Sequence, residues 1–413
     1  MPHIEQRGPR SWRLHVEDPA NSAGKRLPTI KKPIRVDDEK LLKAPTKLNQ
    51  FLQAELHSFI REVEAGEYVK PNKMTFTEFV PEWKKNYANM NLGQYTRKMY
   101  MENINTHLIP EFGEMQIGQI KTIHIVKLMT KLRTPEGRKD GKNKPLATNT
   151  ILNIFKALKS ILDAAKQWGF IAKNPIDGVD RPVADKKEKR EIKSRKKAYS
   201  ASEAEKAILA LYAEPERWKL YFIGVLLGGF RRGEMLGVEW PSVDFEVCGL
   251  WIEKQISLDE AGKKTEAELK TEESEAFVPM PRWYMDELKQ YQHEWKKEKL
   301  QCKKWKGGDK QYVFHRGYGE MYFPSSPTKV WREFLDKHNL PRIRLHDLRH
   351  TTAMLLREDG ADVKAIQERL RHARAATTQD MYMHESKLVS RNTADRLEKF
   401  NPKQLRSQSV PNA

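Results

Sequence analysis

The basic run from Arg181 to Lys197 does most to constrain how this chain can fold. It carries nine Lys or Arg residues and three acidic residues over 17 positions. Charge runs of this density usually stay solvated and flexible rather than entering a core. A chain of 413 residues is also too long for one ordinary domain. We therefore predict a basic linker at residues 182–199, with folded domains on either side.

The charge balance indicates a polyanionic partner. The formal net charge is +19, and an excess of this size attracts polyanions and speeds their capture. Nucleic acid and an anionic membrane surface both fit. No stretch approaches the roughly 18 apolar residues that span a bilayer, because the longest dense apolar run is Leu220 to Leu227. A path of the basic linker across a nucleic-acid backbone is therefore as reasonable as a purely solvated linker.

Cysteine content and the N-terminus predict a reducing, cytoplasmic setting. The first residues lack the apolar segment of a signal peptide. Cys248 and Cys302 are the only cysteines, which excludes a disulfide framework and a four-cysteine metal site.

Residues 1–69 predict a small β-sheet packed on one helix. Trp12, Leu14 and Val16 alternate with polar residues, as in a half-buried strand. Apolar residues then recur at helical spacing between Leu48 and Val63. Basic residues interleaved with the strands favour a DNA-binding module, although a solubilising surface would look the same.

Residues 72–181 predict an all-helical domain. Apolar positions recur at helical spacing in four segments, residues 75–83, 95–108, 125–132 and 151–165. We expect the second of these helices to stop before Pro110 and the fourth to end at Gly169.

Residues 200–395 predict an α+β domain with a small antiparallel sheet, followed by a polar tail at 396–413. Ser200 is expected to cap the first helix, with Glu203 three residues on. Residues 250–256 and 276–280 are expected to be the outer strands of the sheet. The predicted fold class is therefore multidomain and mainly α.

A Lys-rich stretch from Trp295 to Lys310 contains two tryptophans. Such a stretch could contact DNA, whereas a solvated helix end and loop is the simpler interpretation.

Six residues of the third domain supply what chemistry on a phosphodiester needs: Arg231, Lys270, His346, Arg349, His372 and Tyr382. A catalyst must neutralise the non-bridging oxygens and protonate the leaving oxygen. Guanidinium suits the first task because its fork binds two oxygens and stays charged. Lys and His suit the second, because their pKa values respond to the environment. A tyrosine needs nearby positive charge or a base to attack at neutral pH.

Each of these residues also has a simpler explanation when taken alone. Arg231 follows two glycines at a junction between helices, where an arginine can merely cap a turn. His346 and Arg349 would share one helix face, but His-x-x-Arg arises by chance in many basic proteins. Lys270 lies in a turn between two expected strands, and Tyr382 lies in a short expected helix, where a tyrosine is usually core.

The order and spacing of the motifs resemble the tyrosine recombinase, or phage integrase, family. The resemblance rests on GGFRRGE, LKTEESEAFVP, HDLRH, and LRH followed by TTQDMY. Glu234 matches the acidic residue that follows the first arginine of the family and is expected to be a supporting contact. Gly228 and Arg371 stand where Thr and Gly are common. Arg371 would therefore either crowd the backbone or add a phosphate contact.

The same resemblance extends to the other domains. Residues 72–181, which include GFIAKNP, are similar to the core-binding domain of the family. Residues 1–69 resemble the arm-type DNA-binding domain of the longer integrases found in phages and conjugative transposons.

The resemblance implies a site-specific recombinase that integrates or excises a mobile element. Tyr382 would attack the scissile phosphate and form a 3′-phosphotyrosyl link, which the 5′-hydroxyl of a partner strand would reverse. Arg231, Arg349 and His372 would hold the phosphate, Lys270 would be the general acid, and His346 would assist proton transfer. No metal or other cofactor is implied. The expected partners are double-stranded DNA at core and arm sites, other protomers in a tetramer, and accessory DNA-bending or excision proteins, at the bacterial nucleoid and away from membranes.

Two alternatives remain open at the level of the sequence. A type IB topoisomerase shares the chemistry but relaxes DNA as a monomer, and a non-catalytic architectural protein would only bind DNA. The complete set of six residues argues against the second. A metal-dependent transposase needs carboxylates from distant segments, whereas Asp37, Asp38 and Glu39 are contiguous. Relaxases of the paired-histidine type need His-x-His, which none of the 12 histidines forms.

Overall fold

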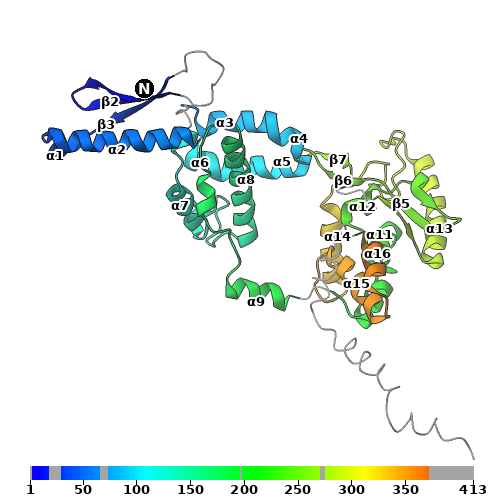
Figure 1. The fold of residues 1–413 in the computed structure, drawn as a ribbon. Helices are drawn as coiled ribbons and strands as arrows, with labels where there is room; N and C mark the ends of the chain where they lie inside the picture. The colour runs from blue at the N-terminus through cyan, green and yellow to red at the C-terminus, as the bar shows by residue number, and fades with distance from the viewer. Residues whose placement is uncertain (1, 18–28, 66–72, 196–197, 270–274, 372–413) are drawn as a thin grey trace, which may run out of the picture. The chain divides into compact units, whose positions relative to one another are not determined.

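The chain folds into two compact units, Met1–Ala184 and Asp185–Ala413 (Figure 1). The computed structural model describes residues 2–17, 29–65, 73–195, 198–269 and 275–371. Both units are mainly helical and carry small antiparallel sheets, which confirms the predicted fold class.

The chain begins with a three-stranded sheet packed on one long helix, as predicted. Strands β1 (His3–Gly8), β2 (Ser11–Glu17) and β3 (Thr29–Arg35) pair antiparallel in that order. After the short α1 (Glu39–Leu42), α2 (Pro45–Glu64) presents Leu56 and Phe59 to Leu14 and Val16. Alternate residues of a strand point to opposite faces, so the apolar positions of β2 meet α2 while Arg13 does not.

The second part of this unit is a bundle of helices with its own core. Thr75 caps α3 through a reciprocal pair of hydrogen bonds with Glu78, 3.2 and 2.8 Å long. The apolar face of α8 is fully buried, and Gly169 ends that helix in the left-handed region at φ 73°. The longer helices are α3 (Phe76–Trp83), α5 (Gln94–Asn103), α7 (Thr122–Leu132) and α8 (Thr148–Gln167). The shorter ones are η1 (Lys84–Ala88), α4 (Asn89–Asn91), η3 (Ile117–Gln119), η4 (Pro135–Gly137) and η5 (Pro175–Gly178).

The predicted stop before Pro110 is wrong. Helix α5 continues through a π-helical turn, η2 (Ile104–Leu108), into α6 (Ile109–Phe112). The wider π turn shifts the backbone hydrogen bonds, so Pro110 falls in the first turn of a new α segment. A proline needs no N–H partner there, and the chain stays helical across it.

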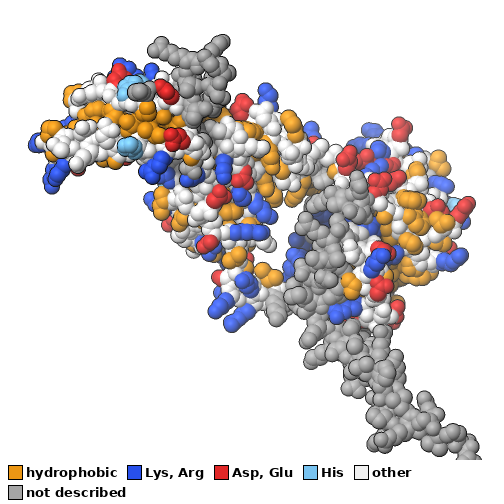
Figure 2. Space-filling model, in the orientation of Figure 1, with side chains coloured by type: hydrophobic (Ala, Val, Ile, Leu, Met, Phe, Trp, Pro, Cys, Tyr) orange, Lys and Arg blue, Asp and Glu red, His pale blue; other side chains and the backbone are white. Residues whose placement is uncertain are grey.

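Part of the basic run forms a helix. Helix α9 (Lys186–Ser194) begins at Asp185, whose Oδ1 accepts a hydrogen bond from the Glu188 backbone N–H at 2.7 Å. Lys and Arg side chains project from this helix into solvent (Figure 2). A helix that is polar on every side draws little stability from packing.

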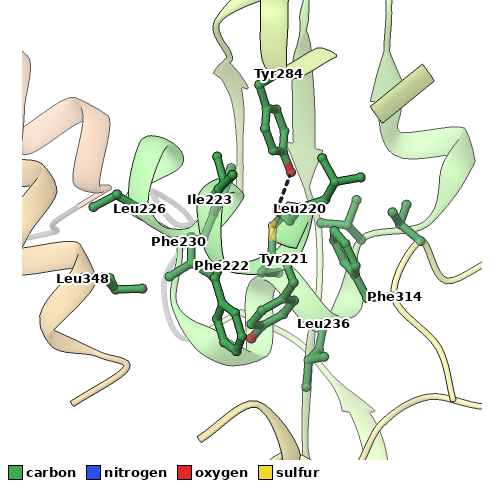
Figure 3. Close-up of a cluster of buried hydrophobic side chains, with 14 of the residues drawn as sticks. Leu220, Tyr221, Phe222, Ile223, Leu226, Phe230, Leu236, Tyr284, Phe314 and Leu348 are labelled. Atoms are coloured by element: carbon green, nitrogen blue, oxygen red, sulfur yellow. Dashed lines mark hydrogen bonds between the residues drawn. The ribbon is translucent and has the colours of Figure 1, made fainter. Parts of the chain in front are cut away.

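The second unit is built around α11, which is buried on all sides. Phe222 and Ile223 of this helix lie among side chains from the surrounding helices, including Leu348 and Tyr284 (Figure 3). The Tyr284 hydroxyl donates to the Leu220 carbonyl at 3.0 Å. The helices of this unit after α9 are α10 (Ala201–Leu211), α11 (Glu216–Gly228), α12 (Arg232–Gly237), η6 (Trp240–Ser242), α13 (Arg282–Gln301), α14 (Ser326–Lys337), α15 (Asp347–Glu358) and α16 (Val363–Leu370). The predicted cap of α10 by Ser200 and Glu203 is confirmed.

The sheet of the second unit differs from the prediction in its strand order. Strands β4 (Val243–Asp244), β5 (Gly249–Ile252) and β8 (Ala276–Pro279) form one sheet in that order. The two strands expected at opposite edges therefore pair directly, with β5 in the centre. A separate hairpin of β6 (Gln255–Leu258) and β7 (Lys264–Ala267) lies between them in sequence, which a local pattern of alternation does not reveal.

The two tryptophans of the Lys-rich stretch belong to the core. Trp295 is buried, and its indole N–H donates to the Tyr312 carbonyl at 3.0 Å. Trp305 packs edge-on against it with ring centroids 5.4 Å apart. These indoles therefore do not face a nucleic acid, while neighbouring lysines such as Lys303 stay exposed.

Candidate functional site

Arg231 lies at a junction between two helices, as predicted. Helix α11 ends at Gly229, whose left-handed φ of 59° turns the chain, and Arg231 is the N-cap of α12. The Glu234 carboxylate accepts from the Arg231 backbone N–H at 2.9 Å and from its Nη1 at 2.6 Å. The backbone N–H of Arg231 at the start of α12 is therefore occupied by a carboxylate of the chain itself.

Arg349 joins the ends of two helices from inside the unit. It lies in the first turn of α15 and is 1% exposed. Its Nη1 donates to the Gly229 carbonyl and its Nη2 to the Leu370 carbonyl. These carbonyls lie where α11 and α16 end, and helix C-termini carry partial negative charge. The guanidinium therefore compensates both helix ends.

The two arginines lie close together because both bind the turn at Leu370 and Arg371, and Arg349 also binds the turn directly before Arg231. Arg231 Nη2 approaches the Arg371 carbonyl at 3.5 Å, next to the Leu370 carbonyl that Arg349 binds. Arg349 in turn binds the Gly229 carbonyl, two residues before Arg231. The fold thus brings together two guanidinium groups that are 118 positions apart in sequence.

Arg371 adds a third guanidinium that the sequence did not assign. Its backbone is left-handed, with φ 52°, and the residue is 4% exposed. Nη2 donates to Glu234 Oε2 at 2.7 Å, and the guanidinium lies over the Phe230 ring with its carbon 5.1 Å from the centroid. The structure favours neither of the two expectations for this residue, because its Nη2 is bound to an internal carboxylate. The residue fits the backbone in a conformation where glycine is usual, and its side chain binds an internal carboxylate.

Burial and charge shape the ionisation of this cluster. Burial alone would raise the pKa of Glu234, but the charges of Arg371 and Arg231 outweigh it and lower the pKa below its ordinary value. Burial, with the charges of Arg231 and Arg371, lowers the pKa of Arg349 to about 9. Guanidinium groups are cationic at neutral pH, so three positive charges surround one carboxylate. The excess positive charge favours an anion such as a phosphodiester.

His346 lies directly before α15 and is exposed. Part of the ring is nevertheless shielded from water by the protein around it. This desolvation, and then the charges of His350 and Arg349, lower the pKa of His346. Its ring meets that of His350 edge-on, with centroids 5.6 Å apart. A neutral imidazole has one donor and one acceptor nitrogen, so this side chain can pass a proton.

Asp347 fixes the start of the helix that carries these residues, and sequence reasoning missed it. It is fully buried and accepts from the Arg344 backbone N–H at 2.9 Å. Arg195, at the end of the basic run, approaches it at 3.6 Å. The available signal was the acidic residue within HDLRH, since an acid in the first turn of a helix stabilises its N-terminus.

Lys270, His372 and Tyr382 lie outside the described residues. The sequence places Lys270 between β7 and β8, and His372 two positions after the end of α16. Over the ranges that the structure describes, no three His, Cys, Asp or Glu side chains are grouped to hold a metal ion. No helix within those same ranges is long and apolar enough to cross a membrane.

The chain is similar to known proteins over most of its length. Residues 199–388 match the phage integrase family, and residues 75–133 match the SAM-like N-terminal domain of phage integrases. A tyrosine recombinase XerC-like protein of Caldanaerobacter subterraneus is 27% identical over 349 residues, which cover 82% of this chain and 86% of that protein.

Solved structures show the same fold. The Tn1549 transposon integrase, in complex with transposon right end DNA, has a TM-score of 0.62 at 18% identity, covering 78% of this chain and 99% of that one. A lambda integrase tetramer bound to a Holliday junction has a TM-score of 0.53 at 17% identity, covering 91% and 94%. Together these matches place the chain in the phage integrase family of tyrosine recombinases.

Proposed function

We propose that this protein is an integrase that cleaves and rejoins DNA through a 3′-phosphotyrosyl intermediate on Tyr382, to integrate or excise a mobile element. The observation that carries the proposal is the pair Arg231 and Arg349, which both bind the turn at Leu370 and Arg371. A planar guanidinium fork suits the non-bridging oxygens of a phosphodiester, and two such groups lie together here.

The proposed reaction is a pair of transesterifications. The Tyr382 Oη–phosphorus bond forms as the bond from phosphorus to the 5′-oxygen breaks, and Lys270 protonates that leaving oxygen. Arg231, Arg349 and His372 hold the phosphate, and His346 assists proton transfer. The 5′-hydroxyl of a partner strand then displaces the tyrosine. The ester conserves the bond energy, so the exchange needs no external energy source.

The proposed partners follow from the family likeness. The Tn1549 and lambda integrases are bound to DNA in their structures, and the lambda enzyme is a tetramer on a Holliday junction. We assign core-site DNA to residues 72–181 and arm-site DNA to residues 1–69. Four protomers would act on two duplexes at the bacterial nucleoid, with accessory DNA-bending or excision proteins.

Covalent trapping tests the proposal. The probe is a duplex carrying the junction of the element's ends, nicked so that the cleaved fragment diffuses away and religation fails. The wild-type protein should accumulate a protein–DNA adduct on denaturing gels. Tyr382→Phe should form none while its binding affinity for the same duplex is unchanged, since only the nucleophilic oxygen is removed. An adduct with Tyr382→Phe would show that the assignment is wrong.

A further inference from the structure

Arg371 takes up a backbone conformation that favours glycine. Three non-glycine residues of the described ranges have a positive φ, namely Cys248, Asn339 and Arg371. A Cβ in this region lies close to the following carbonyl and costs free energy. The hydrogen bonds of the Arg371 guanidinium offset this cost.

The guanidinium closes a ring of three residues. Arg231 Nη1 donates to Glu234 Oε1 at 2.6 Å, and Arg371 Nη2 donates to Glu234 Oε2 at 2.7 Å. The Arg371 carbonyl lies 3.5 Å from Arg231 Nη2. One residue thus binds both the carboxylate that holds Arg231 and, through its backbone, Arg231 itself.

Burial gives the three members of the ring different roles. The side chains of Arg371 and Glu234 are each 2% exposed, whereas that of Arg231 is 32% exposed. Arg371 is further held by the Phe230 ring beneath it, and its Nη1 donates to the Arg369 carbonyl at 3.3 Å. The buried pair is therefore the fixed part, and Arg231 is the part that a DNA phosphate can reach.

We propose that Arg371 is a positioning residue that fixes Arg231, through Glu234, in the orientation that receives the scissile phosphate. This inference rests on the proposed function, because it gives Arg231 the role of phosphate ligand. Arg371 does not touch DNA itself. Arg371 holds the Arg231 side chain at two points, through the Glu234 carboxylate and through its own carbonyl, and so restricts the motion of Arg231. Preorganised donors stabilise a transition state more than mobile ones do.

A purely structural ion pair is the competing explanation, and it predicts different measurements. An ion pair that only supports the fold would lower the thermal midpoint of unfolding and leave the cleavage rate of bound DNA unchanged. A positioning residue changes the single-turnover cleavage rate constant at saturating protein, whereas the dissociation constant for DNA changes little.

The test uses the full-length protein and the nicked junction duplex. Arg371→Met keeps the length of the side chain and removes the charge, and it should slow cleavage of bound DNA about 10–100-fold, as loss of an outer contact to an active-site group does. Arg371→Lys keeps a cation beside Glu234 and should recover part of the rate. Arg332→Met, at an exposed arginine of the same unit, is the matched control and should cleave like the wild type.

The pH dependence supplies a second measurement. Glu234 faces the guanidinium groups of Arg231, Arg371 and Arg349. Removal of Arg371 takes away the largest of the charges that lower the Glu234 pKa, so Glu234 in the variant takes up a proton at higher pH and releases Arg231. The ratio of the wild-type to the Arg371→Met rate should therefore grow as the pH falls. A structural role would leave this ratio constant.

Arg231→Ala distinguishes failure of the positioning role from failure of the proposed function. If Arg231→Ala loses cleavage but Arg371→Met cleaves like the wild type, the positioning role is overturned and the proposed function stands. If Arg231→Ala cleaves normally, the proposed function itself fails. Should Arg371→Met not fold, Arg371→Gly removes the side chain and relieves the backbone cost, and the same rate and pH ratio decide with that variant.

Discussion

At the scale of single residues, the burial of Arg349 shows how the site and the fold depend on each other. A guanidinium with 1% exposure is unusual, and it is tolerated because two carbonyl groups accept its hydrogens. The planar fork reaches both acceptors at once. The residue proposed to bind the phosphate therefore also stabilises the fold.

Arg349→Lys should destabilise the second unit as well as impair cleavage. One ammonium group cannot reach the Gly229 and Leu370 carbonyls together. A buried carbonyl left without a partner costs about 1–3 kcal/mol, and the free energy of unfolding from urea titration should fall by that amount. Arg332→Lys, at an exposed position, should leave it unchanged. Equal stability of Arg349→Lys and wild type would show that the two carbonyl contacts contribute nothing.

His315 makes the second unit sensitive to acid. Its side chain is fully buried, and Nδ1 accepts from the backbone N–H groups of Gly317 and Gly319 at 3.0 and 3.1 Å. Burial, and then the charge of Arg217, lowers the pKa of His315 to about 3. The unfolded chain binds a proton below pH of about 6.5, whereas the folded unit does not. Stability is therefore full above that pH and is lost as the pH falls toward 3.

His315→Asn should remove this part of the acid sensitivity, because an amide oxygen can accept the same two N–H groups without titrating. Between pH 7.5 and 5.5 the wild type should lose about 1 kcal/mol more stability than the variant, measured as urea unfolding at each pH. The other titrating groups are common to both proteins and cancel in the comparison. Identical losses would contradict the assignment.

Single residues also mark the limit of what the sequence could predict. The motifs placed Arg231 and Arg349 in one site, and the structure brings them together. They did not reveal the bond between Arg371 and Glu234, because the two residues are 137 positions apart and the left-handed backbone sets the side-chain direction. The roles of Lys270, His372 and Tyr382 stay predictions.

At the scale of elements, the turn after α11 determines where both arginines lie. Gly229 has a φ of 59°, and a Cβ there would come within 2.6 Å of Leu370 Cδ2. Its carbonyl is also the acceptor of Arg349 Nη1. A change at this glycine therefore affects the turn, α16 and the arginine at once.

Gly229→Ala should cost more than the same change at a glycine with equal backbone strain and free space. Gly308, in the same unit, has a φ of 56° and nothing within 4 Å of an added Cβ. Gly308→Ala should lose about 1–2 kcal/mol from the left-handed backbone alone. Gly229→Ala should lose more, measured by urea unfolding, and should also slow cleavage. Equal losses of stability in the two variants would show that the Leu370 side chain moves away from the added Cβ at no energetic cost.

Elements with a regular apolar period were the most predictable from sequence. The predicted helix over residues 151–165 appears as α8, and the predicted cap at Ser200 is present. The prediction failed at Pro110, where a π turn accommodates the proline. It also failed for the order of the strands in the second sheet, because pairing between distant segments leaves no periodic signal.

At the scale of the whole molecule, electrostatics should dominate the affinity for DNA. The net charge is +19, and each neutralised phosphate releases counterions, so affinity falls as salt rises. With six or more phosphates bound, the affinity for the junction duplex should fall about 10³-fold between 50 and 200 mM salt, as measured by fluorescence anisotropy. An affinity that is independent of salt would contradict this.

The salt dependence of DNA affinity can also test whether helix α9 contacts DNA. Four of its basic residues, Lys186, Lys187, Lys189 and Arg190, are exposed. If the run crosses the DNA backbone, their change to glutamine should reduce the salt slope by about 1 for each phosphate that the variant no longer neutralises. Lys206 and Lys289, exposed on α10 and α13, are the control pair and should leave the slope unchanged. An unchanged slope in the α9 variant would mean that the run is only solvated.

The bonds of Arg349 have a further consequence for the stage of folding at which the site can form. Its guanidinium spans the ends of α11 and α16, and α16 is the last described element of the chain. A polypeptide that ends before Leu370 lacks the second carbonyl and cannot hold this arginine in both bonds. The guanidinium geometry proposed to receive a phosphate therefore forms only after α16 has been made and has packed against α11.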